Sequence, residues 1–144
     1  MKKLLYPFGV AAFCVCAGLS SCSSDAKLKA MIEASATACP SEIAKDFVME
    51  SIKDDGSYVV YRYVYADSLY DPLANMKRYG AEKVKQTSLR TLRDTPGSKE
   101  FFEEVGNAGR GFKYVYIGMP SGDSSALVIE PEEVQAIVRE QVGR

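Results

Sequence analysis

The chain has 144 residues, with 18 basic and 19 acidic side chains and no histidine. Its slight negative charge argues against a nucleic-acid partner, because such binding needs clustered Lys and Arg to neutralise phosphates. The lack of histidine excludes Ser-His-Asp and Cys-His catalysis and most zinc sites. We therefore expect no cofactor, no metal and no nucleic acid.

The first 21 residues have the layout of an export signal. Lys2 and Lys3 precede an uncharged apolar run from Leu4 to Gly18, which is too short for an ordinary membrane span. An uncleaved anchor helix is the alternative interpretation, and the length of the run disfavours it. We predict a signal peptide over residues 1–21.

The segment Leu19-Ser20-Ser21-Cys22 resembles the lipobox of bacterial lipoproteins. In that family the cysteine takes a diacylglyceryl group, the chain is cut before it, and the new amino group is acylated. The resemblance implies that Cys22 fixes the protein to a membrane, since several acyl chains anchor stably. In that family an Asp directly after the cysteine favours retention in the inner membrane. Ser23 occupies this position, so the resemblance implies an outer-membrane location facing the periplasm.

Residues 22–26 are predicted to form the lipidated N-terminus and a short tether, and residues 27–144 a single domain. Cys39 is then the one cysteine left for the domain, so no internal disulfide can form. A single thiol in an oxidising compartment is either buried or available to another chain. Burial is the favoured interpretation, because free cysteine is among the most buried residue types.

The first half of the domain predicts a helix over residues 25–38, which the Cys39-Pro40 step ends. Residues 41–46 are expected to be a connector. The aromatic and β-branched stretch 58–65 predicts a strand, paired with residues 47–53 through a turn at Asp54–Ser57.

The second half predicts a helix over residues 71–93, with Gly80 in close approach to another element, and a short helix over 98–105. A glycine-rich segment, Gly106–Gly111, leads to strands over 112–118 and 125–129, joined by the turn Met119–Asp123. A last helix opens at Pro131. The order α-β-β-α-α-β-β-α predicts the α+β class, with an antiparallel sheet of about four strands and helices on one face.

Acidic pairs are the one arrangement that would suit catalysis without histidine, by a two-carboxylate hydrolase. They lie at Asp54-Asp55, Glu103-Glu104 and Glu130 with Glu132-Glu133. These positions are a turn, a helix end and a helix start, where acids are ordinary surface residues. We therefore predict that the protein is not an enzyme.

Tyrosine is the unusual enrichment of the domain. A tyrosine-rich sheet face can bind a glycan, a peptide or a protein, because each ring offers apolar area and a hydroxyl. Packing in the core beneath the helices is the alternative, and the favoured one. The candidate face consists of Tyr61, Tyr63, Tyr65, Tyr114 and Tyr116.

The whole chain resembles the small lipoproteins of Bacteroidetes-type bacteria. The likeness rests on the lipobox, the Cys39-Pro40 step, the run from Val59 to Val64 and the final hairpin before a Pro-Glu-Glu helix. It implies a lipid-anchored envelope protein and carries over no activity. The tyrosine-rich strands motivate the prediction of a non-enzymatic binding or accessory module with a protein or glycan partner. The alternative is an exported hydrolase inhibitor that inserts Gly106–Gly111 or Met119–Asp123 into a cleft.

Overall fold

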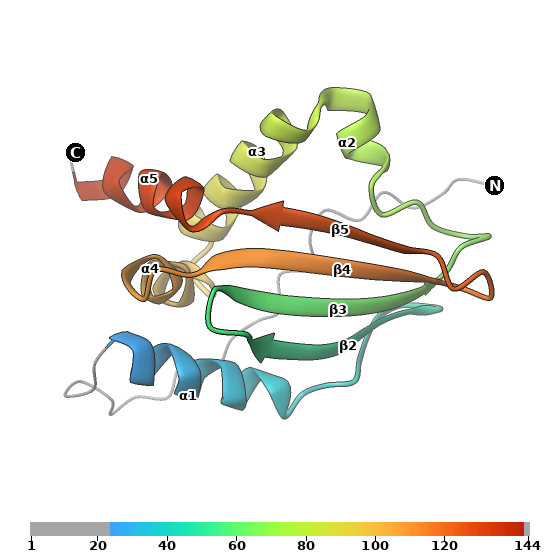
Figure 1. Ribbon diagram of the computed structural model, residues 1–144, viewed down its shortest axis with the longest axis horizontal. Coiled ribbons are helices and arrows are strands. Elements are labelled where there is room, and N and C mark those ends of the chain that lie inside the picture. Colours follow the sequence, from blue (N-terminus) through green and yellow to red (C-terminus); the bar gives the residue numbers. More distant parts are fainter. Residues whose placement is uncertain (1–23, 143–144) are drawn as a thin grey trace.

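The computed structural model describes residues 24–142, so Cys22 and the predicted signal peptide lie outside the described residues. This part of the chain forms a mixed α+β domain with a sheet and helices around it (Figure 1). The elements are α1 (Ser24–Ala36), β1 (Ser41–Ala44), β2 (Phe47–Asp54), β3 (Tyr58–Ala66), α2 (Ala74–Tyr79), α3 (Ala81–Asp94), α4 (Lys99–Asn107), β4 (Gly111–Met119), β5 (Ser124–Ile129) and α5 (Pro131–Val142). No helix within residues 24–142 is long and apolar enough to cross a membrane.

The sheet has the strand order β1-β2-β3-β4-β5, and its centre is a parallel pair. β3 and β4 run parallel from Tyr58 opposite Gly111 to Ala66 opposite Met119, whereas the other neighbours are antiparallel. The prediction of an antiparallel sheet of about four strands is therefore wrong in strand number and in this pairing. The chain can return parallel because α2, α3 and α4 provide the long crossover that parallel strands require.

β1 is the strand that the sequence did not predict. Residues 41–46 were expected to be a connector, but Ser41 pairs with Met49 and Glu42 with Val48 at the sheet edge. Four residues with a register shift give too short a pattern for an alternation of polar and apolar side chains to be recognised.

Gly80 divides the predicted helix 71–93 into α2 and α3. Its φ of 88° is in the left-handed region, and a Cβ atom there would meet nothing within 4 Å. The expected close approach to another element is therefore wrong. Glycine is needed here because the backbone bends through a positive φ. The bend leaves α2 as a short helix with no buried residue.

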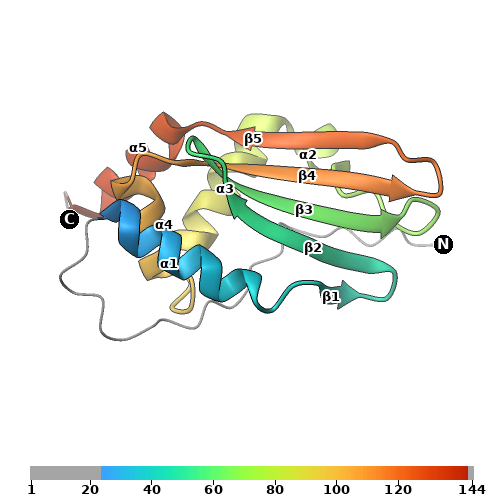
Figure 2. The same cartoon turned by 60° about the horizontal axis from the view of Figure 1, so that its bottom comes forward.

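Burial alternates along the central strands and separates two sheet faces. Val59, Tyr61 and Tyr63 of β3 are buried, whereas Val60 and Val64 between and beside them are half-buried and Arg62 is exposed. α1 packs against β2 and α4, as Figure 2 shows, and α5 packs against β4. Helices therefore cover one face, and the other carries half-exposed aliphatic side chains. The covered face also buries Leu28, Phe101, Phe102, Val105, Val134 and Ile137 from the helices.

Candidate functional site

The predicted tyrosine face is part of the core. Tyr61 stacks on Tyr114 with ring centroids 5.1 Å apart, and Tyr63 stacks on Tyr116 at 5.2 Å. None of these four side chains is more than 3% exposed. Burial raises the pKa of each of their hydroxyls, so they stay neutral. Only Tyr65 is half-buried, and the five tyrosines therefore do not form an exposed binding face.

The acidic positions singled out by the sequence hold local structure together. Asp55 Oδ1 accepts hydrogen bonds from the amides of Ser57 and Tyr58, and Glu133 accepts one from the amide of Glu130. Glu130 also accepts the Tyr58 hydroxyl at 2.7 Å. These bonds tie the carboxylates to a turn and a helix start rather than to a common cleft. Among the described residues no group of His, Cys, Asp and Glu could hold a metal ion.

Arg110 joins the start of α1 to the end of β2. Its guanidinium donates to Asp54 at 3.0 Å and also binds Asp25 in the first turn of α1. Burial alone would raise the pKa of Asp54, but the bonds from Arg110 and from the Gly56 amide outweigh it and lower that pKa. The first turn of α1 is therefore fixed to the sheet.

Cys39 is half-buried against the core. Burial raises the pKa of its thiol, so the thiolate that nucleophilic chemistry requires is disfavoured.

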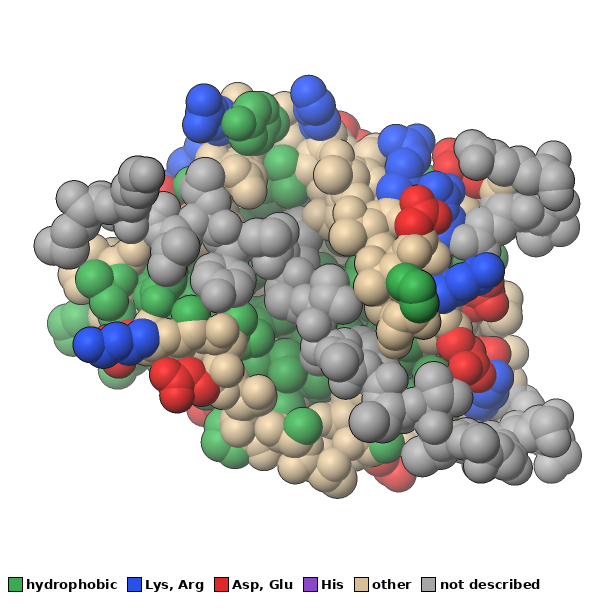
Figure 3. Space-filling model, turned by 180° about the vertical axis from the view of Figure 1, so that it is seen from behind, with side chains coloured by type: hydrophobic (Ala, Val, Ile, Leu, Met, Phe, Trp, Pro, Cys, Tyr) green, Lys and Arg blue, Asp and Glu red, His purple; other side chains and the backbone are tan. Residues whose placement is uncertain are grey.

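The exposed surface of α2 and α3 is the most distinctive feature outside the core. Six basic side chains lie between Lys77 and Arg93, with Glu82 the one acidic side chain in that stretch. Residues 77–83 are all exposed. Tyr79, 49% exposed, is one of two large hydrophobic side chains at the surface of the described chain. Figure 3 shows Lys and Arg side chains flanking a hydrophobic one along this edge.

Two cations lie over the ring of Tyr79. The Arg78 guanidinium carbon is 5.2 Å from the ring centroid, and Lys83 Nζ is 5.9 Å away. Neither makes an ion pair with a carboxylate within residues 24–142. Both charges therefore remain available to an anionic ligand, and the ring holds them close together.

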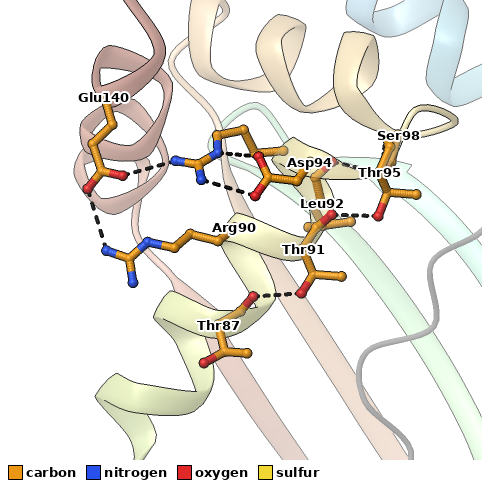
Figure 4. Close-up of polar contacts among 9 residues, drawn as sticks. Thr87, Arg90, Thr91, Leu92, Asp94, Thr95, Ser98 and Glu140 are labelled. Atoms are coloured by element: carbon orange, nitrogen blue, oxygen red, sulfur yellow. Dashed lines mark hydrogen bonds and ion pairs between the residues drawn. The ribbon is translucent and has the colours of Figure 1, made fainter. Parts of the chain in front are cut away.

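An open recess of about 410 Å³ continues this surface along α3 (Figure 4). Thr91 Oγ1 donates to the Thr87 carbonyl at 2.9 Å, and Thr95 Oγ1 donates to the Thr91 carbonyl at 2.6 Å. Their hydroxyl hydrogens are thus occupied by the backbone, and their oxygens can accept from a ligand. The recess is lined by Thr87, Arg90, Thr91, Asp94 and Thr95.

Arg90 is the cation of the recess and is only weakly held. It lies 3.6 Å from Glu140, and both side chains are about half exposed. Arg93 binds the same Glu140 at 3.0 Å and also pairs with Asp94, so these two acids are largely neutralised by a different cation. Arg90 can therefore turn to a ligand at little cost, because exposed ion pairs contribute about 0–1 kcal/mol. We call Lys77, Arg78, Tyr79, Lys83, Thr87, Arg90 and Thr91 the cationic face.

This face was not among the sites expected from the sequence. Its signal was present in the excess of Lys and Arg over acids between residues 77 and 93. This stretch falls within the predicted helix 71–93, and charged residues are ordinary on the solvent face of a helix. Tyr79 and Lys83 stand four positions apart, the spacing of neighbours on one helix face, and their contact crosses the bend at Gly80.

Comparison with known proteins gives the fold but no family. No family model matches the chain, and no curated protein matches it. A solved structure from Pseudomonas aeruginosa, described as that of a "putative secreted protein", is similar with a TM-score of 0.50 and 13% identity. The match covers 80% of this chain and 99% of that one. At this identity the likeness shows a shared fold alone.

Proposed function

We propose that the protein is a lipid-anchored cell-envelope protein that binds a partner rather than catalysing a reaction. The lipobox motivates the anchor, and the first described element, α1, includes Ser24, two positions further along the chain. The secreted-protein description of the structural neighbour agrees with export. The proposed location is the outer membrane, with the domain facing the periplasm.

The cationic face is the proposed binding surface, and its ligand an anionic glycan. Arg78, Lys83 and Arg90 supply positive charge without strong internal partners, and Tyr79 supplies a flat apolar surface. The threonine oxygens accept hydrogen bonds, so the ligand should offer hydroxyl donors as well as anionic groups. A sugar polymer that carries carboxylates has both, whereas an acidic peptide lacks most of the hydroxyls.

Co-sedimentation with insoluble peptidoglycan tests this proposal, with chitin as a neutral glycan and soluble polyglutamate as an acidic-peptide competitor. We expect the Cys22→Ser protein to sediment with peptidoglycan and not with chitin. Replacing Arg78 and Lys83 together by Ala should weaken binding at least tenfold, which corresponds to about 1.4 kcal/mol.

The matched control replaces Lys53 and Lys99 by Ala, which are exposed cations outside the cationic face. This control should bind like the wild type. Equal loss in both double variants would show non-specific charge attraction and overturn the proposal. Complete displacement by polyglutamate would assign the face to an acidic polypeptide instead.

The inhibitor alternative relied on two protruding loops, and the structure gives one of them another role. Gly106 and Asn107 belong to α4, and Gly109, with a φ of 71°, ends this helix in the left-handed conformation. The turn at Met119–Asp123 remains exposed, but no observation favours insertion into an enzyme over a simple hairpin turn.

A further inference from the structure

We infer that one particular end of the domain rests on the lipid bilayer. This inference depends on the proposed lipid anchor at Cys22 and adds a defined orientation to it. The Cα atoms of Cys22 and Ser24 are two residue steps apart along the chain, and an extended chain spans at most about 3.6 Å per residue. The start of α1 therefore lies within about 7 Å of the residue that would carry the acyl chains.

The start of α1 cannot swing away from the domain without breaking several contacts. Asp25 binds Arg110, and Lys27 Nζ bridges Glu100 at 3.0 Å and Glu104 at 3.1 Å on α4. Leu28, one turn further, is fully buried. A short link joined to a fixed helix restricts how the domain can tilt, unlike a long flexible tether.

We call the end of the domain that contains the start of α1 the anchor end. The strands show which other segments lie there. Arg110 also binds Asp54, at the end of β2, so the β2–β3 turn lies beside the first turn of α1. Because Tyr58 pairs with Gly111, the starts of β3 and β4 also lie at the anchor end. Figure 1 shows these segments together, at the end of the sheet away from the β4–β5 turn.

The composition of the anchor end suits the lipid headgroup layer rather than the hydrocarbon. Asp25, Lys29 and Asp55 are charged and Ser57 is polar. The two exposed large hydrophobic side chains of the described chain, Tyr79 and Met119, lie elsewhere. The anchor end should therefore touch headgroups without inserting, and the acyl chains alone enter the membrane.

The opposite end of the sheet should point away from the bilayer. Met119 closes β4 eight residues after Gly111, which corresponds to about 26 Å at the usual rise of a parallel strand. α2 also lies away from the start of α1 (Figures 1 and 2), so the part of the cationic face that α2 carries, Lys77, Arg78 and Tyr79, is held clear of the membrane. This placement suits a ligand in the periplasm.

Fluorescence quenching in vesicles tests the orientation, because the chain contains no tryptophan. Ser57→Trp places a reporter in the exposed β2–β3 turn, and Met119→Trp places one at the far end. The lipidated proteins are reconstituted in phosphatidylethanolamine–phosphatidylglycerol vesicles that contain a lipid with a nitroxide on its headgroup. We expect strong quenching of Ser57→Trp and little quenching of Met119→Trp.

A failure of the anchor can be distinguished from a failure of the proposed orientation. Protein that does not float with vesicles refutes lipidation, before any quenching is read. Floating protein with equal quenching of both reporters, or with neither quenched, overturns the orientation. Stronger quenching of Met119→Trp overturns it as well.

A six-residue Gly-Ser insert between Ser23 and Ser24 provides the matched control. It leaves lipidation and the fold unchanged but lengthens the link. If the short link sets the orientation, the insert should reduce the difference between the two reporters. An unchanged difference would show that contacts of the domain with lipid, and not the link, orient it.

Discussion

Gly106 of α4 lies directly against Val138 of α5. A Cβ atom at position 106 would be 2.8 Å from Val138 Cγ2, closer than two carbon atoms approach without a shift. A glycine inside a helix costs about 1 kcal/mol relative to alanine, and here it allows the two helices to pack closely.

Gly106→Ala should therefore destabilise the domain, by about 1–3 kcal/mol, since the overlap outweighs the gain in helix propensity. Urea unfolding measures the change. Adding Val138→Ala should recover part of the loss that Gly106→Ala causes, because the two sites are in contact. Gly97→Ala is the control, as a Cβ there meets nothing within 4 Å. Additive effects of the Gly106 and Val138 changes would contradict the proposed overlap.

Arg110→Met should cost about 2 kcal/mol of unfolding free energy, because it leaves the mostly buried Asp54 without its charged partner. Arg62→Met removes a similar pair, with Glu50, in which both side chains are about half exposed. That control should cost no more than about 1 kcal/mol. Equal losses in the two variants would show that the bridge from Arg110 has no special role.

The effect of Arg110→Met should also depend on pH. The pKa of Asp54 is lower in the folded protein than its ordinary value of 3.8. A lowered folded pKa adds stability that is fully present above the unfolded pKa and is lost as pH falls through the folded one. The stability difference between wild type and Arg110→Met should therefore shrink below about pH 4. A difference that grows on acidification would contradict this assignment.

Substitutions of Tyr61 distinguish a core role of the tyrosines from a binding role. Tyr61→Phe keeps the ring that stacks on Tyr114 and should change the unfolding free energy by less than about 1 kcal/mol. Tyr61→Ala removes that ring from the core and should cost about 3–5 kcal/mol. If the Tyr61→Ala protein were fully stable but lost partner binding, the result would show that these tyrosines form a ligand site.

Binding through the cationic face should weaken steeply with salt. The charges of Arg78 and Lys83 are exposed, and the screening length falls from about 10 Å at 0.1 M to about 3 Å at 1 M. Sedimentation with peptidoglycan at rising NaCl measures this. Binding that persists at 1 M would indicate an apolar contact, for which Met119 is the next candidate.

Local features could be predicted from the sequence because the information lies within a few residues. The Asp54–Ser57 turn has its positive-φ glycine at Gly56, and the short helix predicted over residues 98–105 corresponds to α4. Pro131 opens α5, as its fixed φ favours.

The long-range features could not be predicted in this way. The parallel pairing of β3 with β4 depends on how three helices return the chain, which no local pattern records. The bridges from Arg110 to Asp25 and Asp54 join residues 85 and 56 positions apart. The bend at Gly80, which the predicted continuous helix 71–93 lacks, separates α2 from α3 within the cationic face.

Lipidation of Cys22 is the central claim and is the most direct to test. The wild type and Cys22→Ser are expressed with an alkyne analogue of palmitate in a bacterium that processes lipoproteins, and the intact mass of each is measured. We predict a labelled wild type that has lost residues 1–21 and carries acyl chains on Cys22, and an unlabelled Cys22→Ser chain. An unlabelled wild type, or equal labelling of both chains, would contradict the account.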